Sequence, residues 1–280
     1  MKAVENGGTA VGIRCRDGVV LAFEKLVTSK LLKKDANKRI ATVDSNIGIV
    51  CVDPPGSPTS TDMRMQVSSG LQPDGKHFVS QARETAASWR SFYKTPISVS
   101  SLANRMGSFV QAYTLYNAVR PFGITAIIGG WDSELEVPVD GQVGTGPSTG
   151  SGGKAPNTKE GGPYLYMIEP SGLYWGYYGA ATGKGRQAAK AELEKLKLSP
   201  DEGGISLEEG VKEAARIIYV AHEDSKDKEF ELEMTWVSKV DGPTKGRHEE
   251  VPKELMEEAE RLAKKALEGE DDEEEEKMEE

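Results

Sequence analysis

Two glycine-rich stretches of this sequence could bind a phosphate group through backbone N–H groups. Gly150–Lys154 resembles a P-loop, but Ser148 stands where the first glycine belongs, and Ala155 follows the lysine where a magnesium-binding Ser or Thr is needed. Gly183–Gly185 precedes a predicted helix and could hold an anion at the helix N-terminus, yet the third glycine of that fingerprint is missing. We therefore interpret Gly183–Gly185 as a place where a strand packs tightly against a helix.

Metal chemistry has little support in the spacing of the potential ligands. The three histidines, His77, His222 and His248, are scattered, and none has a second typical zinc ligand four residues away. Cys15 and Cys51 lie in apolar contexts and are too few for a disulfide framework or a four-cysteine zinc site. We expect no metal site and no cofactor.

The net charge of −10 is concentrated in the C-terminal segment of the chain. Residues 249–280 contain 16 acidic and five basic residues, a net charge of −11, which leaves +1 for residues 1–248. A neutral body with an acidic tail is a poor candidate for binding nucleic acid. The run Glu270–Glu276 repels itself and carries no apolar surface, so we predict that it is disordered.

The hydropathy of the chain is typical of an ordinary globular protein. Of the 280 residues, 37% are hydrophobic, and no apolar run approaches the ~18 residues that a membrane span needs. The first residues contain no hydrophobic segment of the kind found in secretory signals. We expect a soluble, intracellular protein that does not contact membranes.

The elements that position these residues follow from hydrophobic periodicity and turn residues. The aromatic and aliphatic stripes at helical spacing, such as Phe78 to Tyr93, indicate core packing rather than a ligand-binding face. Val19–Phe23 is apolar throughout, which predicts a strand that is buried on both faces. Ser206 and Glu209 have the spacing of a helix-capping box. The predicted strands span residues 9–15, 19–23, 39–43, 47–51, 124–128, 164–168, 173–178 and 231–237, and the predicted helices span 78–93, 102–116, 185–196 and 206–218, with a last amphipathic helix from Pro252.

This order of elements predicts an α+β fold. Two helix pairs enclose a middle that is built of strands, which suggests a four-layer αββα sandwich. Two segments do not fit that rhythm. Val52–Ser68 is an irregular insertion directly after a predicted buried strand, and Gln142–Gly162 is a loop rich in Gly, Ser, Thr and Pro.

Several short motifs follow one another in a fixed order along the chain. In chain order they are Gly7–Gly12, Arg16–Val20, Glu24-Lys25, Ser69–Asp74, Arg120–Gly123, Pro170–Gly172, Gly183–Gly185 and Phe230–Glu233.

In this order the motifs resemble the sequence blocks of proteasome α-type subunits. Phe230–Glu233 and the acidic tail are most similar to the alpha type-3 branch, which occupies position α7 of the ring. The resemblance implies the N-terminal-nucleophile hydrolase fold, whose active members attack peptides with an N-terminal threonine that uses its own α-amine as base. It also implies a location in the cytoplasm and nucleus.

The same resemblance implies that this chain is not catalytic. In the better alignment Gly8 takes the place of the nucleophile, and Glu24 stands where active subunits have an aspartate. The catalytic lysine would fall near Ile40, with Lys38 and Arg39 adjacent but on the opposite face. The alternative is an active, self-processing threonine hydrolase, because Gly8-Thr9 looks like the bond that active subunits cleave.

The resemblance further implies a structural role in the outer ring of the 20S core particle. The partners would be neighbouring α subunits, the β ring and proteasome activators or the regulatory particle, in ubiquitin-dependent protein degradation. The first helix pair would pack against the β ring. Lys38 or Arg39 would pair with the C-terminal carboxylates of activators; the alternative is a solvated pair of charges. A third possibility is a free-standing binding module, which predicts a stable monomer.

Some features depart from the family pattern. Family members carry a segment upstream of the position of Met1, and they run from the strand at Cys51 almost directly into Ser69. We hypothesise that residues 52–68 are a short intron read as coding sequence, which a transcript joining Cys51 to Ser69 would support. We divide the chain into an α-subunit domain at residues 1–248, with the insert 52–68 and the loop 142–162, and a C-terminal helix with an acidic tail at 249–280.

Overall fold

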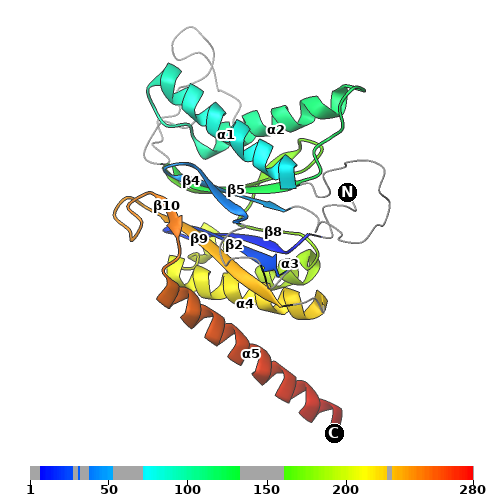
Figure 1. The fold of residues 1–280 in the computed structure, drawn as a ribbon. Helices are drawn as coiled ribbons and strands as arrows, with labels where there is room; N and C mark the ends of the chain where they lie inside the picture. Colours follow the sequence, from blue (N-terminus) through cyan, green and yellow to red (C-terminus); the bar gives the residue numbers. More distant parts are fainter. Residues whose placement is uncertain are drawn as a thin grey trace.

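The computed structural model describes residues 7–27, 31, 38–52, 72–132, 161–225 and 229–279. Most of the insert 52–68 and of the loop 142–162 lies outside these ranges, as does Gly150–Lys154. Two five-stranded antiparallel sheets stack face to face, and helices cover both outer surfaces (Figure 1). The predicted α+β sandwich of four layers is therefore confirmed.

The first sheet contains the predicted strands 9–15 and 19–23, which pair as an N-terminal hairpin. Strand β1 pairs with β2 along its whole length, with Ala10 opposite Phe23 and Arg14 opposite Val19. The order across the sheet is β10-β9-β2-β1-β8. The strands span Ala10–Arg14 (β1), Gly18–Leu26 (β2), Gly179–Thr182 (β8), Phe230–Ser238 (β9) and His248–Glu250 (β10).

The second sheet has the order β3-β4-β5-β6-β7. Strands β3 and β4, which correspond to the predicted strands 39–43 and 47–51, form a hairpin in which Ile40 lies opposite Val50. Strand β7 is shorter than the predicted strand 173–178, because the chain leaves this sheet after Gly176 and enters the first sheet as β8. The strands span Ile40–Asp44 (β3), Ile47–Val52 (β4), Thr125–Asp132 (β5), Gly162–Ile168 (β6) and Tyr174–Gly176 (β7).

Helices form the two outer layers. Helices α1 and α2 cover the second sheet, whereas α3 and α4 cover the first (Figure 1). A short 3₁₀ helix, Pro200–Glu202, lies between α3 and α4. The helices span Gln72–Tyr93 (α1), Val99–Leu115 (α2), Arg186–Lys195 (α3), Leu207–Ser225 (α4) and Lys253–Glu279 (α5).

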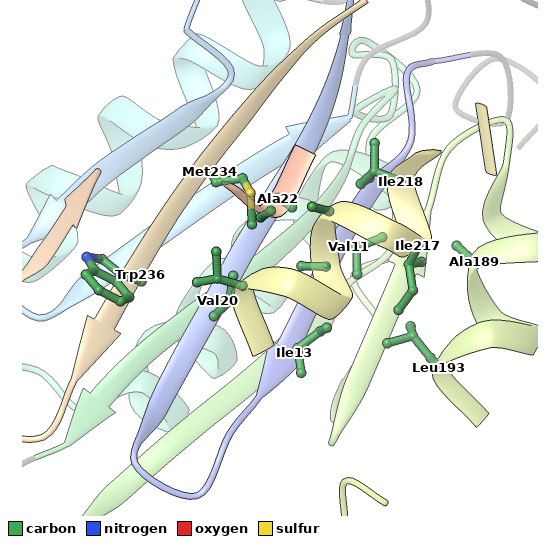
Figure 2. Packing of buried hydrophobic residues seen from close by; sticks show 14 of the residues in the cluster. Val11, Ile13, Val20, Ala22, Ala189, Leu193, Ile217, Ile218, Met234 and Trp236 are labelled. Carbon is green, nitrogen blue, oxygen red and sulfur yellow. The ribbon is translucent and has the colours of Figure 1, made fainter. Parts of the chain in front are cut away.

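Strand β2 shows why the sandwich needs apolar strands. Val20 and Ala22 belong to the core cluster between the first sheet and helices α3 and α4, which also contains Ile217 (Figure 2). Val19, Leu21 and Phe23 point the other way, into the core between the two sheets. Since successive side chains of a strand point to opposite faces, a strand between two layers must be apolar at every position. The prediction for Val19–Phe23 is confirmed.

Helix α4 begins at the predicted capping box. The side-chain oxygen of Ser206 accepts from the Glu209 N–H at 3.3 Å, and the Glu209 carboxylate accepts from the Ser206 N–H at 2.9 Å. These reciprocal bonds satisfy two N–H groups that the first turn would otherwise leave open. The helix that follows buries Leu207, Val211 and Ile218 against the first sheet.

Helix α5 leaves the body of the molecule after packing on α4 (Figure 1). Ala259, Ala263 and Leu267 are buried, and the Lys264 ammonium lies 5.7 Å from the centroid of the Tyr219 ring. The helix continues through residues 270–276, where we predicted disorder. Glutamate is a good helix former, and a helix nucleated by a packed segment propagates at low cost.

Candidate functional site

Thr9, the nucleophile in the alternative of a self-processing hydrolase, is buried within the fold. Its side chain is fully buried, and its backbone N–H donates to Glu24 Oε2 at 2.9 Å. The Thr9 carbonyl accepts from the Glu24 N–H at 2.8 Å, and its Oγ1 accepts from the Gly185 N–H at 3.1 Å. Each polar group of Thr9 is therefore hydrogen-bonded within the fold.

Glu24 joins Thr9 to helix α4. Its side chain is 2% exposed, and the second carboxylate oxygen lies 2.6 Å from His222 Nδ1. The His222 ring in turn packs against Phe230, with ring centroids 4.3 Å apart. A buried carboxylate needs partners at both oxygens, and Glu24 has them in an amide and an imidazole from two different layers.

Close backbone contacts complete this enclosure. A Cβ on Gly8 would lie 2.1 Å from the Glu24 carbonyl oxygen, and one on Gly183 would lie 2.4 Å from the Gly8 carbonyl oxygen. Gly183 also has φ +106°, a conformation that favours glycine. A Cβ on Gly185 would meet Ala221 of α4 at 2.8 Å. The prediction that Gly183–Gly185 serve tight packing is confirmed.

This arrangement does not supply the chemistry of an active threonine hydrolase. The hydroxyl oxygen of Thr9, the atom that would attack a substrate, is buried and accepts from the Gly185 N–H. The position that the resemblance assigns to the catalytic lysine carries Ile40, whose side chain is buried between the sheets. Both observations disfavour Thr9 as a nucleophile.

Two of the sequence motifs meet at the start of helix α1. The Arg120 guanidinium forms a bidentate ion pair with Asp74, with N–O distances of 2.6 and 2.8 Å, and the Gly123 N–H donates to the same carboxylate. Partial burial favours the protonated carboxyl, but these hydrogen bonds outweigh it and lower the pKa of Asp74 below its usual value. The motif Arg120–Gly123 thus fixes the entry to α1.

The predicted activator-binding residues, Lys38 and Arg39, lie directly before strand β3. Lys38 Nζ forms an ion pair with Glu250 Oε1 of β10. The Arg39 guanidinium carbon lies 5.9 Å from the centroid of the Phe23 ring. The backbone N–H groups of Arg39 and Ile40 donate to the Glu233 carboxylate at 2.9 and 3.0 Å. Both candidates therefore sit at the edge where the two sheets meet.

His248 connects the two sheets at this edge. Its Nδ1 lies 2.9 Å from Thr42 Oγ1 of β3, and its Nε2 lies 2.9 Å from Thr235 Oγ1 of β9. The backbone N–H of His248 donates to the Ser45 carbonyl at 2.7 Å. Burial lowers the pKa of His248 to about 4, so the ring is neutral at pH 7.

The three histidines remain apart in the fold, as their spacing suggested. His77 stacks on Phe122 at 5.9 Å, on the side of the molecule formed by α1 and α2. Within the described ranges, no group of three or more His, Cys, Asp or Glu residues could hold a metal ion. The helices in these ranges are also too short or too polar to cross a membrane.

No pattern in the sequence indicated several of these partners. Glu250 and His222 are separated from Lys38 and Glu24 by about 200 positions along the chain, and no spacing rule connects them. Glu233 belongs to a motif that we quoted, but its role in holding the backbone before β3 emerged only from the structure.

Comparison with known proteins agrees with this geometry. Residues 4–52, 61–156 and 154–237 match the family model described as "Proteasome subunit". Residues 53–60, inside the predicted insert, are left out of that match.

Full-length relatives carry related names. The chain is 48% identical over 272 residues to a protein of Saccharomyces cerevisiae named "Probable proteasome subunit alpha type-7", covering 97% of this chain and 78% of the relative. A Schizosaccharomyces pombe protein of the same name is 44% identical, and the Acanthamoeba castellanii "Proteasome subunit alpha type-3" is 46% identical. Both alignments cover 97% of this chain and 87% of the relative. Together with the enclosed Thr9 and the four-layer sandwich, these matches show that the chain belongs to the proteasome subunit family, among its α-type members.

Proposed function

We propose that this chain is a non-catalytic subunit of the α ring of the 20S proteasome, where it supports ring assembly, the substrate-entry pore and activator docking. The observation that carries this proposal is the state of Thr9. Thr9 is fully buried, its Oγ1 accepts from the Gly185 N–H, and the buried Ile40 stands where the resemblance places the catalytic lysine. The names of the relatives support the same role.

The outer face of helices α1 and α2 supports a contact with another ring. Phe92 is 78% exposed, and Leu115 and Tyr116 are 65% and 67% exposed. Large apolar side chains that are exposed on one layer are typical of a surface that a partner covers. We propose that this layer faces the β ring.

Activator docking is assigned to the edge that carries Lys38 and Arg39. A C-terminal carboxylate of an activator would pair with the Lys38 ammonium, which is half-exposed. The rigid backbone before β3, held by Glu233, would keep that ammonium in place. Degradation of ubiquitin-tagged proteins in cytoplasm and nucleus is part of this proposal.

Native isolation of the tagged endogenous protein tests the proposed function. We expect the chain in a large particle with peptidase activity, at an intact mass that includes the residues before Thr9. Recovery as a small active species that starts at Thr9 would show self-processing and make the chain an enzyme. Recovery as an inactive monomer would support a free-standing binding module instead.

Peptide mapping of the same particle tests the predicted insert. Peptides that join Cys51 directly to Ser69 would show that residues 52–68 are absent from the mature protein. Peptides from within 52–68 would show that the segment is translated, and the intron hypothesis would be wrong.

A further inference from the structure

The edge formed by β3 and β10 already holds a carboxylate where the activator is expected to bind. Glu250 Oε1 pairs with the Lys38 ammonium, the same group that would receive the C-terminal carboxylate of an activator. A side-chain carboxylate and a C-terminal carboxylate are the same acceptor chemically, so they compete for one cation. The geometry at Lys38 thus accepts a carboxylate, and one of this chain's own is bound there.

The position of Glu250 is set by a buried anchor two residues earlier. His248 bridges Thr42 of β3 and Thr235 of β9 with distances of 2.9 Å on both sides. Residues two apart on a strand lie on the same face, so the anchor that directs His248 towards β3 also directs Glu250 towards Lys38. The backbone of β10 is fixed as well, since Glu250 lies opposite Thr235 in the sheet.

The pair itself is open to water. The side chains of Lys38 and Glu250 are 50% and 67% exposed, whereas the His248 anchor beneath them is 7% exposed. Exposed ion pairs contribute little to stability, so a competing carboxylate could displace Glu250 at small cost. The exchange requires rotation of one side chain and leaves β10 in place.

The charged side chains around Lys38 determine how strongly this exchange affects the affinity for a carboxylate ligand. Lys25 pairs with Glu231 at 2.9 Å, and Glu233 binds the backbone before β3. Removing the charge of Glu250 would take away the carboxylate that pairs with Lys38.

We propose that Glu250 is a built-in competitor of the activator: it occupies Lys38 in the free subunit and is displaced when a C-terminal carboxylate docks. This inference rests on the proposed function, because it concerns regulation of the same docking edge. Glu250 would lower the affinity of the edge for weak carboxylate ligands and would keep the Lys38 side chain oriented between binding events.

Zero-length cross-linking of the intact particle tests the competition directly. A carbodiimide joins a carboxylate to a lysine amine only when the two are in contact, and mass spectrometry identifies the linked residues. The probes are an apolar heptapeptide with a free C-terminal carboxylate and the same peptide as its C-terminal amide. We expect a Lys38–Glu250 cross-link in the free particle that is replaced by a Lys38–peptide cross-link with the carboxylate peptide and is unaffected by the amide.

Variants give the size of the effect. In particles that carry Glu250→Gln, half-maximal cross-linking of the peptide to Lys38 should require about two- to fivefold less peptide, the range expected for an exposed ion pair. Glu249→Gln is the matched control, because it removes the same charge from the adjacent exposed position, which points away from β3.

The outcomes separate this inference from the proposed function. Equal peptide requirement in the two variants, or no Lys38–Glu250 cross-link in the free particle, would overturn the competition while leaving the subunit in its ring. Peptide binding that is unchanged by Lys38→Met would overturn docking at this edge and the competition with it. Recovery of the chain outside any particle would remove the proposed function itself.

Discussion

Two clusters of charged and polar residues lie on opposite faces of the first sheet. On the face towards α4, Glu24 binds the Thr9 amide and His222, and it is 2% exposed. On the face towards the second sheet, Glu233 accepts from the backbone N–H of Arg39, and Glu250 pairs with Lys38. The side chain of Glu250 in this pair is more than half exposed. The first cluster encloses Thr9 within the fold, whereas the second remains accessible to a ligand.

The difference shows how one fold can bury one acidic side chain as part of its structure and leave another exposed to solvent. Burial of a carboxylate without partners is costly, so Glu24 commits its oxygens to the fold and is unavailable for chemistry. An exposed pair contributes little to stability and can be exchanged. Burial, more than residue type, decides which of the two acidic clusters is structural.

The largest expected effect comes from removing the buried carboxylate. Glu24→Ala should lower the free energy of unfolding by about 3–5 kcal/mol, because it leaves the Thr9 N–H and His222 without their acceptor. Urea unfolding of the purified chain measures this change. Glu231→Ala is the comparison, since the Glu231 side chain is 34% exposed in its pair with Lys25, and we expect a loss below about 1 kcal/mol. Equal losses for the two variants would break the distinction between the clusters.

Packing around the enclosed Thr9 can be tested without changing a charge. Gly185→Ala places a Cβ 2.8 Å from Ala221 and 2.9 Å from Thr9 Oγ1, and should cost about 1–3 kcal/mol in unfolding free energy. Gly176→Ala serves as the control, because the nearest atom to its Cβ would be Tyr166 Cε1 at an ordinary 3.5 Å. A Gly185→Ala protein as stable as the control would mean that this end of the sandwich is looser than the structure indicates.

The anchor of the exposed cluster should make stability depend on pH. His248 has a pKa of about 4 in the fold, below its unfolded value of about 6.5, so the unfolded chain takes up the proton first as pH falls. This contribution is present above pH 6.5 and is lost towards pH 4. Between pH 7 and pH 5 the loss should be about 2 kcal/mol. Urea unfolding at both pH values, in the wild type and in His248→Gln, isolates the term; the same slope in both proteins would contradict it.

The smallest effect on stability is expected at the exposed pair itself. Lys38→Met should change the unfolding free energy by less than about 1 kcal/mol, since the ammonium is half-exposed and screened by solvent. The same variant should weaken binding of the carboxylate peptide, measured by fluorescence anisotropy because Lys38→Met also removes the amine that cross-links. Thermal unfolding with and without 0.5 M salt checks the first part, and a large loss of stability would show that the pair is structural after all.

Local patterns predicted most elements of the fold but missed two of its three shortest strands. The apolar run Val19–Phe23 and the capping box at Ser206 each contain their own physical cause, and both were confirmed. Strands β8 and β10 were missed. β8 consists of Gly179–Thr182, and β10 of three residues, so neither carries a recognisable period; each is a strand only because β1 or β9 offers it hydrogen bonds.

The sequence by itself determined the layers, the buried strands and the family resemblance, because these depend on periodicity and on residues close together along the chain. It also placed Lys38 and Arg39 at the start of a strand. Only the tertiary structure decided that Glu24 holds the Thr9 amide and that Glu250 occupies Lys38. These partners are brought together by the stacking of two sheets and helix α4, and contacts between such distant segments leave no pattern in the order of residues.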